Sequence, residues 1–246
     1  MKGIVQLMLL GALFMMTGCA ATMVAIEKKD LKVETLMSDT IFLDVEQNAE
    51  RTIYVDIKNT SDKDFDLMGP VISKLTQRGY TIVNDPKQAG YILQANILQV
   101  GQADPSALRT SVYSGYGGAL AGGLAGVGIA AATGGHGAGI ATGGAIGGIV
   151  GGAAELVAGS MVKDVTFSVI TDIMISERTT DKVQENQSAN LSKGKGTSVQ
   201  QSIKKETNRQ RYQTRIASSA NKVNLKFEEA LPALQDGLSK SISGIF

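Results

Sequence analysis

Few residues of this chain have side chains that could act as a nucleophile, a general base or a metal ligand. The 246 residues include one cysteine, Cys19, one histidine, His136, and no tryptophan. A single cysteine excludes an internal disulfide framework. A single histidine excludes a histidine-rich metal site and argues against histidine-dependent catalysis. The net charge of +1 gives no electrostatic case for nucleic-acid binding.

Two further patterns could carry chemistry, and both have simpler explanations. Glycine pairs between residues 117 and 152 loosely match G-x-G-x-x-G, but the βαβ frame and the acidic partner of a dinucleotide site are missing. Glu228 and Glu229 lie where a helix is expected to begin, and acidic side chains there interact favourably with the helix dipole. We therefore expect no active site, no metal, no cofactor and no enzymatic activity.

The position of Cys19 indicates a lipid anchor. Lys2 and the apolar run of residues 4–16 have the composition and length of a signal peptide, and the run is too short for a good transmembrane helix. It leads into Met16-Thr17-Gly18-Cys19, which resembles the lipobox of bacterial lipoproteins. That resemblance implies cleavage after residue 18, an S-diacylglycerol group on the Cys19 thiol and an N-palmitoyl group on its amine. Several acyl chains, at about 0.8 kcal/mol per buried CH₂, would anchor the chain firmly.

The alternative is a plain secretory signal followed by an incidental cysteine. The residue after Cys19 is Ala20. In lipoproteins of this type an aspartate at that position signals retention in the inner membrane. Its absence points to the outer membrane.

The rest of the chain is organised around an uncharged glycine- and alanine-rich segment, residues 113–162. Residues 110–154 contain no Asp, Glu, Lys or Arg. Two apolar arms, 117–133 and 138–154, flank a Gly-Gly-His-Gly tip. As helices rising about 1.5 Å per residue, and with their flanking residues, both arms reach the length of a hydrocarbon core of about 30 Å. We therefore expect a helical transmembrane hairpin, with a soluble glycine-rich loop or linker as the alternative.

Glycines in both arms recur every four residues. Residues four apart lie on one face of a helix, so the glycines would form a flat stripe that lets two helices approach closely. We expect this stripe to be an oligomer interface. Its members are Gly118, Gly122, Gly126, Gly139, Gly143, Gly147 and Gly151.

Before this segment, alternating and helical patterns predict a small α/β domain. Residues 51–58 place Ile53, Val55 and Ile57 on one face, as in a half-buried strand. A helix is expected between Asp66 as its N-cap and Gly79 just beyond its end. Further strands are predicted at residues 41–45, 80–83 and 91–100.

After the segment, residues 164–178 alternate again as a strand, and residues 211–223 form a returning strand. The polar stretch 180–208 between them is expected to be an exposed loop or a long hairpin tip. Apolar residues with helical spacing run from Phe227 to Ile245. That amphipathic helix is expected to pack on its own sheet, and a contact between subunits is the alternative.

The expected fold class is therefore α+β: a lipid-anchored small α/β domain with an inserted Gly/Ala-rich helical transmembrane hairpin and a C-terminal amphipathic helix. Residues 1–18 would be the lipoprotein signal peptide and 19–112 the N-terminal α/β part. Residues 113–162 would be the transmembrane hairpin. Residues 163–246 would be the β-hairpin and helix that complete the polar domain.

The order of lipobox, polar domain, glycine-rich segment and second polar part resembles the TraT family of outer-membrane lipoproteins, also called complement-resistance or surface-exclusion proteins. The resemblance extends over nearly all of the mature chain and departs in the signal peptide, the segment tip and residues 180–208. The stretches that carry it are 58–64 (KNTSDKD), 94–96 (QAN), 170–172 (ITD), 177–179 (ERT), 212–215 (YQTR) and 220–230 (ANKVNLKFEEA).

The resemblance implies a surface-exposed product of a conjugative plasmid that reduces redundant mating and increases resistance to complement. It implies a homo-oligomer, which we expect to be a ring, and no catalytic residues. The segment tip, Gly134, Gly135, His136 and Gly137, is the candidate for exclusion specificity. One alternative is a surface binding module that engages a donor pilus or an outer-membrane protein without a membrane plug. A carboxylate-only cell-wall hydrolase is the other.

Overall fold

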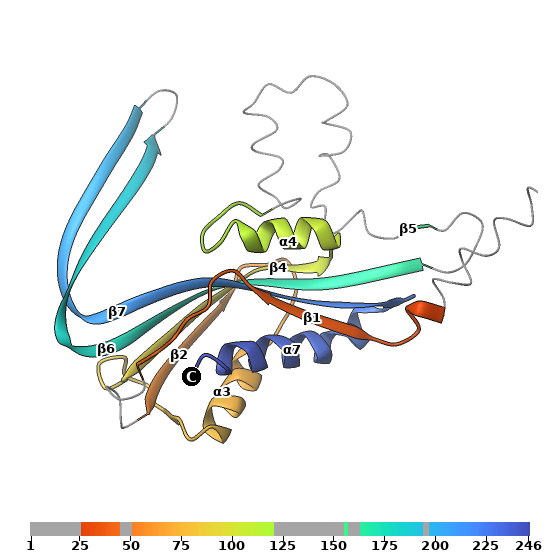
Figure 1. Cartoon of the computed structure of the whole chain (residues 1–246), viewed down its shortest axis with the longest axis horizontal. Helices are drawn as coiled ribbons and strands as arrows, with labels where there is room; N and C mark the ends of the chain where they lie inside the picture. The colour runs from red at the N-terminus through yellow and green to blue at the C-terminus, as the bar shows by residue number, and fades with distance from the viewer. Residues whose placement is uncertain (1–25, 45–50, 121–154, 157–162, 194–196) are drawn as a thin grey trace, which may run out of the picture.

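The computed structural model describes residues 26–44, 51–120, 155–156, 163–193 and 197–246 (Figure 1). Cys19, the expected signal peptide and the tip residues 134–137 lie outside these ranges. For residues 155–156, 185–193 and 197–205 the description covers the backbone only.

Strands from both sides of the glycine-rich segment form one sheet. In the part of the chain that is described, it has seven strands in the order β1-β7-β6-β4-β2-β3, and β5 pairs with β6 off this path. β6 is antiparallel to both β7 and β4, while β2 is parallel to β4 and β3. The strands are β1 (Lys32–Met37), β2 (Thr52–Asn59), β3 (Thr81–Ile82), β4 (Tyr91–Gln102), β5 (Glu155–Leu156), β6 (Lys163–Lys193) and β7 (Thr197–Val223).

Helices cover both faces of this sheet (Figure 1). α3 (Met68–Gln77) and α7 (Phe227–Ser243) lie on one face, and α4 (Pro105–Tyr113) lies on the other. The main core lies under α3 and α7, and a smaller core of Leu108, Val112, Ile170 and Ala217 lies under α4. Each fully buried aliphatic side chain contributes about 1.5–3 kcal/mol.

The predicted inward faces of the strands are confirmed. Tyr91, Leu93, Ala95 and Ile97 of β4 are buried in the main core, as are most of the expected residues of β6. The opposite face of β6 is also buried, because α4 covers it. That second face carries Thr166, Ser168, Ile170 and Asp172.

The two predicted helices are also confirmed. The Asp66 carboxylate accepts the backbone N–H groups of Met68 at 3.1 Å and Gly69 at 3.4 Å, which caps α3 although Leu67 occupies the N-cap position. Gly79 follows the helix with φ +86°, a conformation that favours glycine. α7 packs on its own sheet through Leu234, Leu238 and Ile242, all fully buried.

The predicted strand at 41–45 is wrong for residues 41–44, which belong to no strand. The edge strand is instead β1, whose composition is charged and mixed. The chain leaves the sheet after Met37 because side chains take over the hydrogen bonding: the Asp39 N–H donates to Thr214 Oγ1 at 3.2 Å. The Ser38 hydroxyl donates to the Asp39 carboxylate at 2.8 Å.

The polar stretch 180–208 forms a long hairpin. β4 pairs with β6 as far as Glu177, and beyond a register shift β6 and β7 pair with each other from Val183↔Thr207 to Lys193↔Thr197. Figure 1 shows this two-stranded ribbon bending away from the sheet. We call residues 183–207 the ribbon.

The α+β class with a helical transmembrane hairpin over residues 113–162 is wrong: the described chain is mostly β. None of the helices found in the described residues combines the length and apolarity that crossing a membrane requires. At the start of the expected hairpin, Tyr113 ends the nine-residue helix α4, whose Leu108 and Val112 pack on the sheet. At its end, Glu155 and Leu156 pair with β6 as β5. Residues 121–154 lie outside the described ranges.

Candidate functional site: a buried arginine clamp at the start of the glycine-rich segment

The candidate site is built around a buried ion pair between two neighbouring strands. Asp172 of β6 and Arg215 of β7 lie directly opposite each other in register. Their side chains are 10% and 1% exposed. The Arg215 Nε donates to Asp172 Oδ1 at 2.6 Å, and Nη2 donates to Oδ2 at 3.0 Å. This is a bidentate pair, the strongest geometry that a guanidinium and a carboxylate can adopt.

The remaining N–H groups of Arg215 hold α4 and the turn after it. Nη1 donates to the Ser111 carbonyl at 2.9 Å and to Ser114 Oγ at 3.0 Å. Nη2 also donates to the Gly118 carbonyl at 3.0 Å. Every N–H of the guanidinium therefore has an acceptor, which a buried arginine requires.

Asp172 binds the same turn from the other side, because the Gly117 N–H donates to its Oδ2 at 2.9 Å. Gly117 has φ +67°, and a Cβ added to Gly118 would lie 2.1 Å from the Ser114 carbonyl oxygen. The Ser114 hydroxyl donates to the Ala119 carbonyl at 2.7 Å. Only glycines allow the turn to close this tightly. We call Asp172, Arg215 and the turn at residues 114–120 the arginine clamp.

Local sequence signals position α4 over the ion pair. Asp104 is the N-cap, its Oδ1 accepting the N–H groups of Ser106 at 2.8 Å and Ala107 at 3.1 Å, and Pro105 occupies the first turn. The Ser106 hydroxyl, followed by these backbone N–H groups, holds the pKa of Asp104 below its usual value. The helix therefore begins at a fixed point, and Ser111 falls above Arg215.

The far side of the glycine-rich segment returns to the same sheet near the start of β6. Asp164, which pairs with Glu155 of β5, forms an ion pair with Lys28. Its Oδ1 also accepts Asn221 Nδ2 at 2.7 Å. Both described ends of the segment are thus bound to β6.

A groove of about 260 Å³, lined by polar and apolar side chains, lies beside the clamp. Asp172 and Gly117 line it on one side, and Gln94 and Asn96 of β4 lie at the same end of the sheet. Tyr116, 39% exposed, stands at its border. The arrangement offers hydrogen-bonding groups and one aromatic ring, but its charges are already paired, so it suits support and contact rather than proton transfer.

The sites predicted from the sequence and the clamp overlap at one residue. Gly118 is the only member of the predicted glycine stripe within the described ranges, and there it packs against its own turn and binds Arg215. The other stripe glycines, Cys19 and residues 134–137 lie outside them. Asp172 and Arg215 were missed, although each is the sole charged residue of its buried stretch, 165–176 and 214–220. A charge inside an apolar strand needs a partner, and that signal could have found both.

Comparison with known proteins gives one consistent result. The sequence model of the family described as "Enterobacterial TraT complement resistance protein" matches residues 30–246. A TraT complement resistance protein of Escherichia coli is 42% identical to this chain over 250 aligned positions, which cover all of both chains. A protein of the same name from Escherichia coli strain K12 is 40% identical, over 99% of this chain and 98% of its own length. One from Wigglesworthia glossinidia brevipalpis is 31% identical, over 93% and 90%.

Proposed function

Since the chain belongs to the TraT complement resistance family, we propose that it is an outer-membrane lipoprotein that increases resistance to complement and mediates surface exclusion between cells carrying the same conjugative plasmid. Its role is structural and does not involve catalysis. Cys19 carries the S-diacylglycerol and N-palmitoyl groups, and Ala20 directs the protein to the outer membrane. The chain is exposed at the cell surface.

The observation that carries the structural role is the arginine clamp. Its ion pair is buried, with side chains 10% and 1% exposed, and the other N–H groups of Arg215 donate to two carbonyls and one hydroxyl of its own chain. Such a pair is strongly destabilising when one partner is lost, so it suits a fixed support. We infer that the sheet is a rigid platform from which residues 121–154 are presented.

The presented segment would supply the contacts between copies of the chain. Gly122, Gly126, Gly139, Gly143, Gly147 and Gly151 would let backbones of neighbouring subunits approach closely, in a ring of identical chains. Gly134 to Gly137 would decide which plasmids are excluded. Charged side chains are absent from residues 110–154, so these contacts would depend on packing.

A surface binding module is the second candidate, and the ribbon favours it. Two-stranded hairpins are only marginally stable alone, and beyond Glu177 β6 has β7 as its one neighbour among the described strands. The ribbon would then contact a donor pilus or an outer-membrane protein. In that case the platform would serve mainly to hold the ribbon away from the cell surface.

Mating experiments test the proposal and separate the two candidates. Recipients expressing the chain would be mated with donors carrying the plasmid that encodes it, and transfer would be compared with that into empty recipients. We expect reduced transfer, and restored transfer for Cys19→Ser, which should also lose labelling by radioactive palmitate. Unchanged transfer into recipients that express the wild type would contradict surface exclusion.

A shortened chain tests the ribbon. Val183 and Thr207 are register partners and can be joined by an Asn-Gly turn, which matches the twist of a two-stranded hairpin. The structural role predicts that this variant still excludes. Loss of exclusion with a folded, oligomeric variant, together with loss of pilus binding, would favour the binding module.

A further inference from the structure

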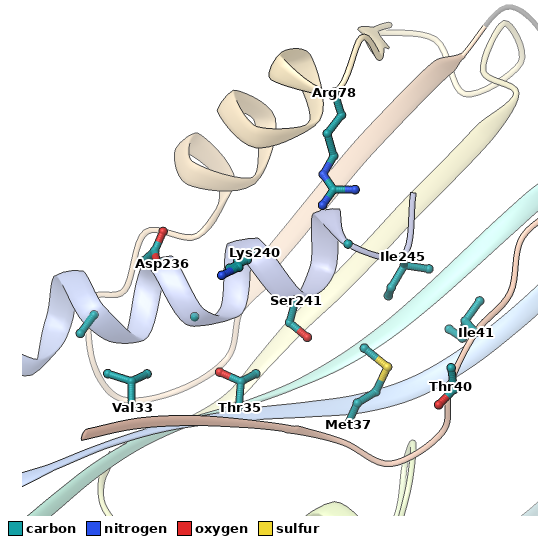
Figure 2. A pocket seen from close by; sticks show the side chains of 13 residues that line it. Val33, Thr35, Met37, Thr40, Ile41, Arg78, Asp236, Lys240, Ser241 and Ile245 are labelled. Carbon is teal, nitrogen blue, oxygen red and sulfur yellow. The ribbon is translucent and has the colours of Figure 1, made fainter. Parts of the chain in front are cut away.

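A groove of about 700 Å³ opens between β1 and α7, on the face of the sheet opposite the arginine clamp (Figure 2). Met37 and Ile41 point into it from β1 and the residues after it, and Ile245 points into it from beyond α7. Its volume lies within the range of about 300–1,000 Å³ that is usual for ligand pockets.

The groove runs along the line where α7 approaches β1, and its lining includes the close contact at Gly237. At Gly237 a Cβ would lie 2.7 Å from Ser218 Oγ and 2.8 Å from Thr35 Oγ1, so the backbone of α7 sits directly on the sheet there. Beyond this contact Leu238 and Ile242 remain fully buried, whereas Ser241 and Ile245 face Met37 across the groove (Figure 2).

Positive charge borders this apolar space. Arg78 and Lys240 both line the groove, and Arg78 reaches from the end of α3 over the last turn of α7 (Figure 2). Asp236, the one acidic residue of the lining, already forms an ion pair with Lys74 at 2.7 Å. Among the residues that the structure describes, none makes a hydrogen bond or an ion pair with the Arg78 guanidinium.

We propose that this groove binds the single acyl chain of an anionic membrane amphiphile, such as a fatty acid or a lysophospholipid, and that Arg78 and Lys240 bind its headgroup. The apolar lining takes the hydrocarbon chain, and the two cations supply charge-assisted hydrogen bonds to a carboxylate or phosphate. This proposal rests on the proposed function in one respect: the ligand would come from the outer membrane.

Two observations favour a membrane amphiphile as the occupant. Phe42, next to the lining residue Ile41, is 82% exposed, and phenylalanine is one of the apolar residues with which proteins enter the membrane interface. The acyl groups expected on Cys19 carry no anionic headgroup, so they would leave Arg78 without a partner. Charge complementarity therefore selects a free anionic lipid over the chain's own anchor.

Binding can be measured with the full chain held in an amphipathic polymer, with dansyl-labelled undecanoate as the probe and its methyl ester as the uncharged counterpart. We expect saturable fluorescence enhancement with the anionic probe and displacement by lysophosphatidylglycerol. Combined Arg78→Gln and Lys240→Gln should weaken binding of the anion about tenfold and leave the ester unchanged. Lys87→Gln, at an exposed lysine outside the groove, is the matched control.

Ser241→Phe should fill the groove and abolish binding of both probes, with an unchanged circular dichroism spectrum as the check on folding. The proposal is overturned if binding does not saturate, if Ser241→Phe binds normally, or if the charge variants bind the anion like the wild type. It is also overturned if only the unlipidated Cys19→Ser protein binds the probe, because the anchor would then fill the groove of the lipidated wild type. Binding only after dissociation of the oligomer would mean that a second copy covers it, which also contradicts the proposal. Because the assay uses purified protein, its result is independent of mating or serum survival.

Discussion

The Nε atom of Arg215 lies 2.6 Å from Oδ1 of Asp172, between residues that face each other across β7 and β6. These strands follow the glycine-rich segment in sequence, whereas the turn that they bind lies at its start. The ion pair therefore ties together chain segments on the two sides of residues 121–154.

Removal of one partner from this pair should cost much stability. Arg215→Met leaves the Asp172 carboxylate buried without its main partner, and we expect the free energy of unfolding to fall by about 3–5 kcal/mol. Denaturant unfolding of the full chain measures it. Arg109→Gln is the matched control, because the Arg109–Glu34 pair is 53% and 52% exposed, and its loss should cost less than about 1 kcal/mol. Equal losses in the two variants would contradict the role of the clamp.

Much of the platform follows from sequence periodicity. Ile53 and Leu93 belong to apolar faces that repeat every second residue in their strands, and Leu234 and Leu238 repeat with helical spacing, so burial of one face predicted β2, β4 and α7. The family resemblance is confirmed by the comparisons, and two of the stretches that carry it, 170–172 and 212–215, contain the ion pair.

The parts that were not predicted depend on tertiary contacts. β1 lacks an apolar alternation because it is an edge strand, and its residues pair with β7 almost at the other end of the sequence, Lys32 with Asn221. α4 has clear signals in Asp104 and Pro105, but the uncharged residues from 110 onwards suggested a membrane span, and Tyr113 was assigned to it. Length and lack of charge could not distinguish a lipid surface from the face of a sheet.

Gly237→Ala tests the close approach of α7 to the sheet at the groove. In an exposed helix interior, alanine would stabilise by about 1 kcal/mol over glycine. Here the new Cβ would lie 2.7 Å from Ser218 Oγ, and we expect a net loss of about 1–3 kcal/mol in the free energy of unfolding. In a Thr35→Ala, Ser218→Ala background the loss should shrink or reverse. A stabilising effect in the wild-type background would rule out the close approach.

Tyr212 should make the fold sensitive to alkaline pH. Burial, and then its hydrogen bond to Glu177 at 3.0 Å, raise the pKa of Tyr212 to about 12. In the unfolded chain tyrosine titrates near about 10, so between these values the unfolded state binds fewer protons. The stabilisation is complete below about pH 10 and is lost as the pH rises through about 12.

Denaturant unfolding from neutral pH to pH 12 measures this dependence. Tyr212→Phe should show a smaller decline in stability at the alkaline end than the wild type. Tyr113→Phe, at a side chain that is 82% exposed, should decline like the wild type. Identical curves for Tyr212→Phe and the wild type would show that the Tyr212–Glu177 bond does not set the alkaline limit.

The proposed subunit contacts can be tested inside the glycine-rich segment. Gly147→Leu should hold neighbouring backbones apart, and we expect loss of the oligomer on size-exclusion chromatography in detergent. Ala145→Leu, two residues away and off the four-residue repeat, adds the same side chain and should leave the oligomer intact. If the oligomer persists in both variants, or is lost in both, the glycine repeat is not the interface.

The central claim is that this chain protects a cell surface as a lipid-anchored structural protein, and survival of a serum-sensitive enterobacterium in active serum tests it most directly. The account predicts higher survival with the wild-type chain than with an empty vector, and no gain in heat-inactivated serum. Cys19→Ser, made in equal amount, should give no protection, whereas Arg109→Gln should protect fully. The account is contradicted if cells with the wild-type chain survive no better than cells with the empty vector, or if Cys19→Ser protects fully.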